Sequence, residues 1–374
     1  MKKHEKYIKQ CLKLAKQGEG LVSPNPLVGA VVLDKNGKVA GTGCHRKYGE
    51  AHAEVNALNE AGERAKGGTL YVSLEPCSHF GKTPPCADLV IGSGIKTLVV
   101  GMIDPNPLVS GEGLERCKNA GIEVITGVLE DECKKLNEVF IKHITQQKPF
   151  VALKTASTMD GKIATKTGSS KWITSSAARE EVQRLRNRYD AILTGSGTVM
   201  ADNPSLNCHM EGGRNPVRIV IDSRLRTNPE SNVYKKDRTR IIVAVTEIVD
   251  KAEFLKFPPY VEFIRCPLNA TGNISLEYLM GQLYERKIMS VLVEAGGKLN
   301  GAFVKEAQEG KNIADKIYWF IAPKILGDNN AQSFIDGFDV EDINDCVQLD
   351  FQEIKHFKPD YMIEAYLSRK FLHL

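Results

Sequence analysis

Residues 52–86 read HAEVNALNEAGERAKGGTLYVSLEPCSHFGKTPPC. The first part, residues 52–62, has the spacing of a helix that ends near Gly62, and the alternating run 69–73 predicts a strand. A short helix is predicted over residues 86–91, after a pair of prolines. Helix, strand and helix in this order are typical of an α/β domain, and histidine, glutamate and cysteine lie at the ends of these elements.

Three side chains in this stretch have the chemistry of a zinc site. His52, Cys77 and Cys86 offer one imidazole and two thiolates, the ligand set of a catalytic zinc that keeps its fourth position open. The prolines before Cys86 suit a helix start, and a thiolate near a helix N-terminus has a lowered pKa that favours metal binding. The alternative is a closed structural zinc site, to which His79 or His45 would add a fourth ligand.

Glu54 lies two residues beyond His52, in the predicted first turn of the same helix. A carboxylate at this place can take a proton from water and return it to a leaving amine. His-x-Glu followed by Pro-Cys and a second cysteine is the expected signature of hydrolytic deamination of a cytosine-like ring. We therefore expect Glu54 to be the catalytic residue and His52, Cys77 and Cys86 to hold one zinc ion.

The composition describes a globular protein with no strong charge bias. With 374 residues, two domains are the natural expectation, and a formal net charge of +4 gives no reason to expect a nucleic-acid-binding surface. The N-terminus lacks the apolar region of a signal peptide, and no segment is apolar enough to span a membrane. We expect a cytoplasmic protein whose other cysteines are reduced, because these have no framework spacing: Cys11, Cys117, Cys133, Cys208, Cys266 and Cys346.

Helix and strand signals alternate in two unlike series, divided near Lys148-Pro149. We expect domains at residues 1–146 and 150–374. The first series predicts helices at 5–17, 52–62, 86–91, 113–120 and 130–144, and strands at 28–33, 38–43, 69–73, 97–100 and 122–125. The second predicts helices at 176–188, 276–286 and after residue 297, and strands at 150–155, 191–193, 217–221, 240–245, 260–264, 290–293, 316–321, 348–354 and 361–367.

Several motifs around the cysteines resemble one protein family. They are Ser23-Pro-Asn-Pro-Leu-Val-Gly29, Gly41-Thr-Gly-Cys-His45, His52-Ala-Glu54, Glu75-Pro-Cys-Ser-His79, Lys82-Thr-Pro-Pro-Cys86 and Asp104-Pro-Asn-Pro107. Together they are similar to the RibD family of bifunctional riboflavin biosynthesis proteins, which join a pyrimidine deaminase to a reductase. The resemblance covers essentially the whole chain.

For the N-terminal half, the resemblance implies a cytidine-deaminase-like α/β/α sandwich. It implies the substrate 2,5-diamino-6-(5-phosphoribosylamino)pyrimidin-4-one, the same zinc ligands and Glu54 as the proton shuttle. The substrate contacts that it implies are Asn25, His45, His79, Lys82, Asp104 and Asn106. From the residues alone, the proline-flanked asparagines could be ordinary turns and Lys82 a solvated loop charge.

The C-terminal half carries weaker signals of its own. Thr194-Gly-Ser-Gly-Thr198 and Glu294-Ala-Gly-Gly297 each follow a predicted strand, and glycine there lets backbone approach a phosphate. Neither is a full dinucleotide fingerprint. Asp222-Ser-Arg224 and Arg226 follow another strand, where a hydroxyl and a guanidinium would suit the 2′-phosphate of NADP, although an ordinary charged loop explains them nearly as well.

The resemblance extends to this half through motifs such as Leu153-Lys-Thr-Ala-Ser-Thr-Met-Asp-Gly-Lys-Ile163, Lys171-Trp-Ile-Thr174, Ala201-Asp-Asn-Pro-Ser-Leu206 and Val293-Glu-Ala-Gly-Gly297. It implies a dihydrofolate-reductase-like α/β domain that uses NADPH to reduce the ribosyl phosphate to a ribityl chain. The implied cofactor contacts are Ala156, Trp172, Thr198, Asp202, Ser223, Gly296 and Gly297. The implied substrate contacts are Lys154, Ser170, Thr174, Arg186, Leu206, His209 and Glu294. Trp172 could equally be a packing residue and Thr198 a helix cap.

One position departs from the family pattern in a way that affects phosphate binding. His209 stands where the family has an arginine, and Asn203 stands where an acid is common. Arginine is always charged, whereas a histidine is mostly neutral at pH 7 unless a nearby phosphate raises its pKa. We expect weaker phosphate anchoring above neutral pH, partly compensated by Arg186 and Lys154.

Two other functions compete with this interpretation. One is a nucleoside or nucleic-acid deaminase with an appended nucleotide-binding domain, although the modest charge argues against a polynucleotide substrate. The other is a zinc-stabilised sensor that regulates a partner. Glu54 and a zinc site with only three protein ligands argue against a sensor. We expect a small-molecule phosphoribosyl pyrimidine as the substrate, no nucleic-acid or membrane partner, and a homo-oligomer.

Overall fold

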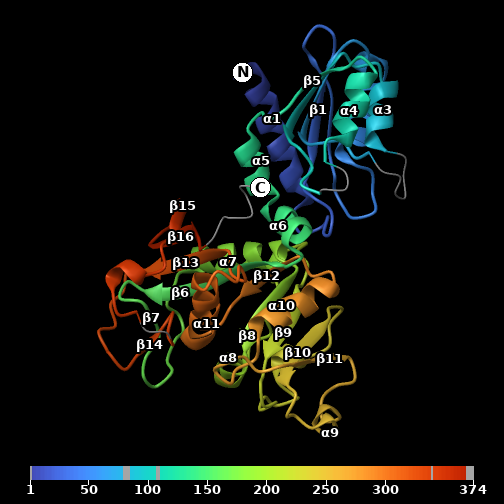
Figure 1. Cartoon of the computed structure of the whole chain (residues 1–374). Helices are drawn as coiled ribbons and strands as arrows, with labels where there is room; N and C mark the ends of the chain where they lie inside the picture. The colour runs from blue at the N-terminus through green and yellow to red at the C-terminus, as the bar shows by residue number, and fades with distance from the viewer. Residues whose placement is uncertain (1, 79–84, 107–109, 338–339, 368–374) are drawn as a thin grey trace. The chain divides into compact units, whose positions relative to one another are not determined.

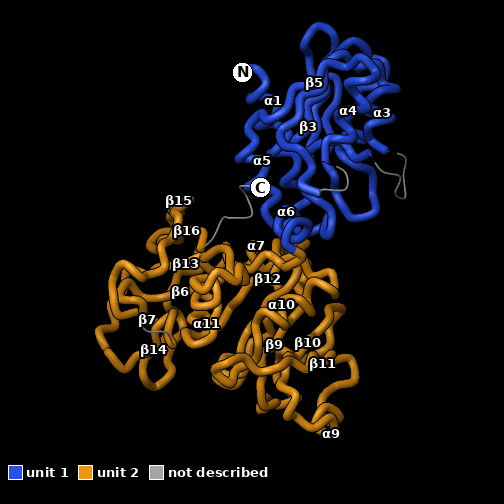
Figure 2. Tube along the Cα trace, viewed as in Figure 1, with its two compact units in different colours: residues 1–146, 371–374 blue, residues 147–370 orange. Residues whose placement is uncertain are grey.

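The computed structural model of the chain describes residues 2–78, 85–106, 110–337 and 340–367 (Figure 1). It divides into two units, the first made of Met1–Gln146 and the second of Gln147–Lys370 (Figure 2). Each unit has its own sheet and its own helices.

The first unit is built on a five-stranded sheet with the order β2-β1-β3-β4-β5. β1 pairs antiparallel with β2 and β3, whereas β3, β4 and β5 run parallel. Every described residue of β1 is buried, and so are all but the first of β3 and β4, as expected for strands covered on both faces. The bounds are β1 Gly29–Leu33, β2 Val39–Cys44, β3 Thr69–Leu74, β4 Thr97–Met102 and β5 Glu123–Ile125.

Helices cover both faces of this sheet and make it a three-layer α/β/α sandwich. A Cβ added to Gly29 of β1 would meet the backbone of α1, whereas a Cβ added to Gly43 of β2 would meet the backbone of α2. Gly43 pairs with Ala30, the residue after Gly29, so the two added Cβ atoms would lie on opposite faces of the sheet. Gly101 of β4 packs on α5, and Figure 1 shows α1 and α5 on one side of the sheet with α3 and α4 on the other. The bounds are α1 Lys2–Ala15, α2 Ala53–Ala61, α3 Cys86–Gly92, α4 Glu112–Asn119 and α5 Glu130–Leu136.

The segment 130–144, expected to be helical, forms two helices: α5 ends at Leu136 and α6 spans Glu138–Gln146. Asn137 lies between them, and its side chain accepts a hydrogen bond from the Leu27 amide (2.8 Å) and donates one to the Leu27 carbonyl (3.0 Å). A side chain that bonds the backbone of a distant loop competes with helical pairing. These hydrogen bonds attach the junction of α5 and α6 to the loop that contains Asn25 and Leu27.

The second unit is built on a nine-stranded sheet with the order β11-β10-β9-β8-β12-β6-β13-β16-β15. The seven strands from β11 to β13 run parallel, and the C-terminal hairpin adds β16 and β15 antiparallel. The bounds are β6 Phe150–Thr158, β8 Ala191–Gly195, β9 Val217–Ile221, β10 Ile241–Thr246, β11 Val261–Cys266, β12 Ser290–Val293, β13 Lys316–Ala322, β15 Asp350–Phe357 and β16 Asp360–Tyr366.

The helices of this unit pack on the parallel sheet through a continuous apolar core. The core joins β6, β8, β9, β10, β12 and β13 to α10 and α11, with Leu279, Leu283 and Phe303 fully buried. The bounds are α7 Ser176–Arg188, α9 Lys251–Phe254, α10 Leu276–Glu285 and α11 Gly297–Gln308. α7 has the expected bounds, since the Ser175 hydroxyl accepts a hydrogen bond from the Ala178 amide and caps the helix. No helix among the described residues has the length and apolar character that crossing a membrane requires.

Several short elements of the second unit were not expected from the sequence, α9 among them. α8 (Ser196–Asp202) follows β8, and β7 (Lys162–Ala164) pairs with β14 (Gln332–Ser333) in a small separate sheet. Glycine disfavours a helix, so the pattern at Gly195 and Gly197 obscured α8. Two or three residues are too few for a strand period to be seen.

Candidate active sites

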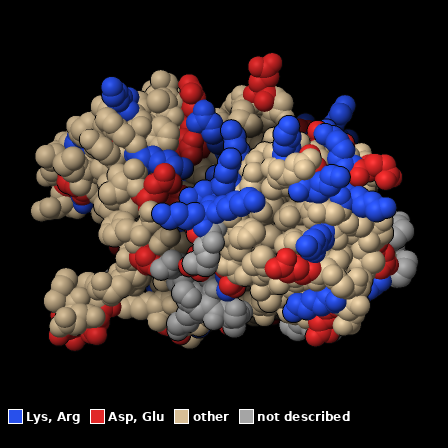
Figure 3. All heavy atoms as spheres, turned by 90° about the horizontal axis from the view of Figure 1, so that it is seen from above, with Lys and Arg blue, Asp and Glu red and all other residues tan. Residues whose placement is uncertain are grey.

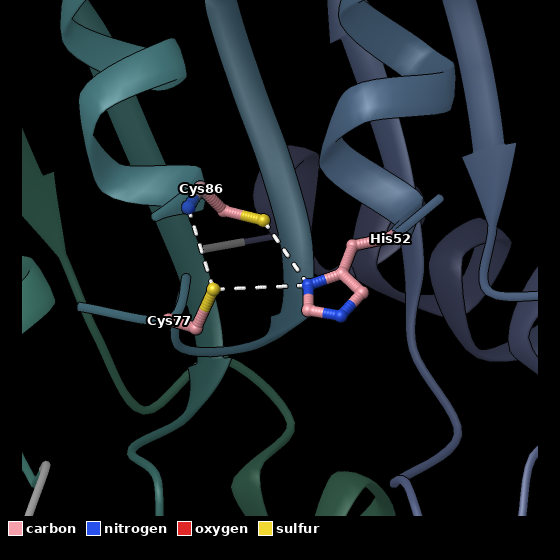
Figure 4. Close-up of side chains that lie close together, drawn as sticks. All are labelled: His52, Cys77 and Cys86. Carbon is pink, nitrogen blue, oxygen red and sulfur yellow. Dashed lines mark hydrogen bonds between the residues drawn. The ribbon is translucent and has the colours of Figure 1, made fainter. Parts of the chain in front are cut away.

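Three side chains of the first unit converge at the ends of three different elements (Figure 4). His52 is the N-cap of α2, Cys77 follows β3, and Cys86 is the first residue of α3. The His52 Nδ1 atom lies 3.2 Å from the Cys86 Sγ atom and 3.7 Å from the Cys77 Sγ atom. A tetrahedral zinc with ordinary bond lengths separates a nitrogen and a sulfur ligand by about 3.6 Å. The donor set and its spacing therefore fit zinc.

The two cysteines are coupled through the start of α3. The Cys86 amide donates to the Cys77 Sγ atom (3.3 Å), and the Ala87 amide donates to the Cys77 carbonyl (3.2 Å). The hydrogen bond from the Cys86 side chain lowers the pKa of the Cys77 thiol to about 4, against the opposing effect of burial. The same hydrogen bond, together with burial, raises the pKa of Cys86. The lowered pKa favours the thiolate form of Cys77, which is the form that binds metal.

Glu54 lies in the first turn of α2 and is only 3% exposed. Burial raises the pKa of its carboxyl to about 7, and the charge of His52 is among the weaker opposing effects. A group whose pKa lies near neutral pH can both accept and release a proton under working conditions. The arrangement therefore places a proton-transfer group beside the three candidate metal ligands.

His45 contacts this cluster without joining it. Its ring lies edge-on to the His52 ring, with 5.3 Å between the centroids. Its Nδ1 atom pairs with the Ala51 carbonyl (3.1 Å) and its Nε2 atom with the Asn25 side-chain amide (3.0 Å). Burial lowers the pKa of His45, which favours the neutral ring that these two partners require. With both ring nitrogens engaged, His45 offers no lone pair for the fourth metal position.

The predicted contacts Asp104 and Asn106 follow β4, beside the strand that leads to Cys77. The Asn106 amide donates to the Asp104 carboxylate (2.9 Å), and the Asp104 amide donates to the buried carboxylate of Glu75 (3.1 Å). The carboxyl ends of adjacent parallel strands are the usual place for ligands in an α/β sheet. His79 and Lys82, the other two predicted contacts, lie outside the described residues.

In the second unit, three predicted substrate contacts form one partly buried cluster. The Arg186 guanidinium makes two hydrogen bonds to the Glu294 carboxylate (2.8 and 3.0 Å), and the Lys154 Nζ atom lies 3.5 Å from the same carboxylate. Burial alone would raise the pKa of Glu294, but the charges of Arg186 and Lys154 lower it to about 2. Arg186 also donates to the Asn207 carbonyl (2.8 Å). The cluster carries two cations and one anion, so its net charge suits an anionic ligand.

Four neighbouring parallel strands direct the predicted reductase residues to one edge of the sheet. Lys154 and Ala156 lie on β6, Glu294 follows β12, Thr198 lies in α8 after β8, and Ser223 follows β9. These strands are adjacent in the sheet order β9-β8-β12-β6. Their carboxyl ends form the crevice in which open α/β sheets bind ligands.

Charged and polar side chains meet where β8 and β9 end. The Arg226 guanidinium donates to the Ser196 hydroxyl at the start of α8 (3.3 Å). The Ser223 carbonyl accepts from the Thr246 hydroxyl (2.7 Å), which holds the turn after β9. Arg226 therefore lies at the start of α8, which leads to Thr198, whereas the contact that places Ser223 is made by its backbone carbonyl.

Trp172 is exposed and lies against a cation. The Arg179 guanidinium lies 4.4 Å from the centroid of its ring, and Arg179 also donates to the Thr174 carbonyl (2.7 Å). The Lys324 ammonium donates to the carbonyls of Trp172 and Ile173 (2.8 Å each). With 65% of its surface exposed, Trp172 is not the packing residue that the alternative required, and a flat ring is available to a ligand.

The remaining predicted contacts occupy several surroundings. Gly296 is the N-cap of α11, and a Cβ on Gly297 would lie 2.2 Å from the Ser333 carbonyl, so only glycine fits there. His209 is exposed, and its amide donates to the Gln183 side chain (2.9 Å). Ser170 is half-buried, Leu206 is buried at a φ of 57°, and Asp202 is exposed at the end of α8.

Sequence reasoning gave no role to Glu75 or Asn137, although both are buried and bond the backbone of predicted site loops. Glu75 precedes Pro76 and Cys77 directly after a predicted buried strand. A charged residue at such a place usually has buried partners, and this could have indicated its role. Asn137 had only a weak signal, an asparagine inside a helical pattern.

Comparison with known families agrees with both halves of the structure. Residues 1–102 match the cytidine and deoxycytidylate deaminase zinc-binding region, and residues 149–363 match the RibD C-terminal domain. The riboflavin biosynthesis protein RibD of Bacillus amyloliquefaciens is 43% identical over 364 residues, covering 96% of this chain and 95% of the relative. The RibD protein of Escherichia coli is 40% identical over 369 residues, covering 95% and 97%.

Solved structures agree over the full length of the chain. A diaminohydroxyphosphoribosylaminopyrimidine deaminase/5-amino-6-(5-phosphoribosylamino)uracil reductase from Thermotoga maritima has a TM-score of 0.85 and 42% identity, covering 97% of this chain and 98% of that one. RibD from Acinetobacter baumannii has a TM-score of 0.86 and 35% identity, covering 98% and 99%. These findings confirm the expected fold class, a cytidine-deaminase-like sandwich followed by a dihydrofolate-reductase-like domain. The chain belongs to the RibD family of bifunctional riboflavin biosynthesis enzymes, which carry a deaminase and a reductase.

Proposed function

We propose that residues 1–146 deaminate 2,5-diamino-6-(5-phosphoribosylamino)pyrimidin-4-one and that residues 150–374 then reduce the ribosyl phosphate of the product with NADPH. The observation that carries the first step is the convergence of His52, Cys77 and Cys86 beside the buried carboxyl of Glu54. The observation that carries the second is the cluster of Lys154, Arg186 and Glu294 at the carboxyl ends of parallel strands.

In the deaminase, His52, Cys77 and Cys86 would hold one zinc ion per chain. When bound there, zinc would supply Lewis acidity that makes water nucleophilic near neutral pH. Glu54 takes a proton from the attacking water and delivers it to the leaving amine, so that water is consumed and ammonia is released. The raised pKa of Glu54 supports both proton transfers.

The substrate side of this site is assigned to side chains around the cluster. Asn25 and His45 are linked to each other and lie next to the His52 ring, and Asp104 and Asn106 follow the neighbouring strand. The two asparagines suit hydrogen bonds to a polar pyrimidine ring, whereas His45, whose ring nitrogens bond Ala51 and Asn25, is proposed as a contact on the family resemblance. His79 and Lys82 are proposed as contacts on the family resemblance alone.

In the reductase, NADPH would supply a hydride to the carbon that the opened ribosyl ring exposes. The proposed cofactor contacts are Ala156, Trp172, Thr198, Asp202, Ser223, Gly296 and Gly297. Lys154, Ser170, Thr174, Arg186, Leu206, His209 and Glu294 are the proposed substrate contacts. Glu294 holds Arg186 and Lys154 in place, and these two cations favour the substrate phosphate.

A mixed surface and free thiols support a cytoplasmic enzyme that acts on small molecules. On the face drawn in Figure 3, acidic side chains lie among the basic ones and neither charge covers the face alone. A polynucleotide site would call for a continuous basic surface. All nine cysteines are free of disulfides, as a reducing compartment requires. We also propose a homo-oligomer, since reductases of this fold often pair.

A two-stage assay tests the proposal. Purified protein is analysed for metal, incubated with the phosphoribosyl pyrimidine while ammonia is measured, and then supplied with NADPH while its oxidation is followed. The proposal expects bound zinc, ammonia release and NADPH oxidation in that order. Faster ammonia release from free cytidine than from the phosphoribosyl pyrimidine would favour a nucleoside deaminase instead.

A further inference from the structure

The Glu75 side chain is a buried carboxylate that accepts three backbone hydrogen bonds. It is 5% exposed, and its donors are the amides of Asp104 (3.1 Å), Gly111 (3.0 Å) and Gly113 (3.1 Å). Hydrogen bonds to an ionised acceptor are about twice as strong as neutral ones. Three such bonds on one side chain hold the surrounding backbone segments in a defined arrangement.

These bonds connect three elements at the edge of the sheet where the metal ligands lie. Glu75 directly follows β3, Asp104 follows β4, and Gly111 is the N-cap of α4. Cys77 is two residues beyond Glu75, so at most about 7 Å of chain separates the carboxylate-bearing residue from a metal ligand. A Cβ on Gly113 would lie 2.2 Å from the Pro76 carbonyl, so α4 also touches this loop directly.

The segment held by Glu75 carries two proposed substrate contacts. Its carboxylate holds the Asp104 amide, and the Asp104 carboxylate in turn accepts from the Asn106 amide (2.9 Å). We infer that Glu75 is a positioning residue, which fixes the Asp104–Asn106 segment beside the metal-binding loop in the conformation that binds the pyrimidine. This inference rests on the proposed deaminase function.

The metal ligands themselves are held by other contacts. The Arg116 side chain of α4 donates to the Ser78 carbonyl (3.0 Å) next to Cys77, and it pairs with Asp88 two residues after Cys86. Loss of the carboxylate at position 75 therefore leaves both thiols anchored. Substrate binding and zinc binding should respond differently to the same substitution.

Replacement of Glu75 by glutamine removes the charge and keeps the size. In the wild type both carboxylate oxygens of Glu75 accept hydrogen bonds from backbone N–H groups. Glutamine replaces one of these oxygens by an NH₂ group, which is a donor and cannot accept such a bond. Asp34→Asn is the matched control, because Asp34 also accepts two backbone hydrogen bonds, from Asn36 and Lys38, in the β1–β2 turn. Both variants exchange a carboxylate for an amide in the same unit.

Steady-state ammonia release, zinc content and NADPH oxidation are measured for the wild type and both variants. In Glu75→Gln we expect the KM for the phosphoribosyl pyrimidine to rise about tenfold or more, with kcat within about threefold, because the lost contacts bind substrate and transition state alike. Zinc content and NADPH oxidation should match the wild type, and Asp34→Asn should match it in every assay. An unchanged KM in Glu75→Gln, or loss of zinc together with the rise in KM, would overturn the inference.

Amide hydrogen exchange gives a second readout that does not depend on activity. We expect the peptide that covers residues 101–106 to exchange faster in Glu75→Gln than in the wild type, and to be unchanged in Asp34→Asn. Equal exchange in all three proteins would overturn the inference. Absence of ammonia release by the wild type would count against the proposed function, and the exchange comparison would still decide whether Glu75 holds this segment.

Discussion

Replacement of Glu54 by glutamine should stop deamination while leaving the metal site intact. Glutamine has nearly the same size, so it fits a site where Glu54 is 3% exposed, but it cannot accept and release a proton. Positioned proton transfer contributes about 10²–10⁴-fold to a rate, equal to about 3–5 kcal/mol in the barrier. We expect kcat for ammonia release to fall by about this factor.

The assay compares ammonia release, zinc content and NADPH oxidation in Glu54→Gln and in Glu60→Gln. Glu60 is the matched control, because it is an exposed carboxylate on the same helix whose role is to accept from the Thr42 amide (2.8 Å). Zinc content and NADPH oxidation should be unchanged in both variants, and Glu60→Gln should deaminate normally. Wild-type deamination by Glu54→Gln would refute the proton-transfer role.

Three further predictions concern the metal, the partly buried ion pair of Glu294 and the histidine at position 209. Cys86→Ala should lose zinc and ammonia release but keep NADPH oxidation, as measured by metal analysis and the two assays. The pKa of Glu294 is lowered to about 2, so its stabilisation is present above its unfolded pKa and is lost as the pH falls toward 2. Glu294→Gln should therefore cost about 3 kcal/mol of unfolding free energy at pH 7 and flatten the acid-side dependence in denaturant titrations. His209→Arg should lower the KM of the reductase substrate, because an arginine is always charged and can hold a phosphate with two hydrogen bonds; an unchanged KM would rule out a phosphate contact at position 209.

The elements with strong periodicity could be predicted closely from the sequence. α7 has the predicted bounds because Ser175 caps it, and β9 and β12 have the predicted bounds because each short, mostly apolar run is followed by an acidic residue, Asp222 or Glu294. Candidate zinc ligands could also be predicted, since a ligand set depends on residue type. The grouping of His52, Cys77 and Cys86 in space agrees with that prediction.

The parts that escaped prediction depend on contacts between segments far apart in the chain. The break between α5 and α6 arises because Asn137 bonds Leu27, 110 residues earlier, and no local pattern reports such a contact. The role of Glu75 also depends on distant segments, since the three backbone amides that donate to it lie 29 to 38 residues away in the sequence. Local propensity describes elements, whereas the positions of site loops depend on tertiary hydrogen bonds.

X-ray absorption spectroscopy of the zinc-loaded protein tests the metal site most directly. Two sulfur scatterers at about 2.3 Å, one imidazole nitrogen at about 2.0 Å and one further light atom from solvent are the expected result. The Cys77→Ala and His52→Ala variants should bind too little zinc to give this spectrum, as expected for Cys86→Ala. A spectrum with two imidazoles, or with a fourth protein ligand that filled the solvent position, would contradict an open hydrolytic site.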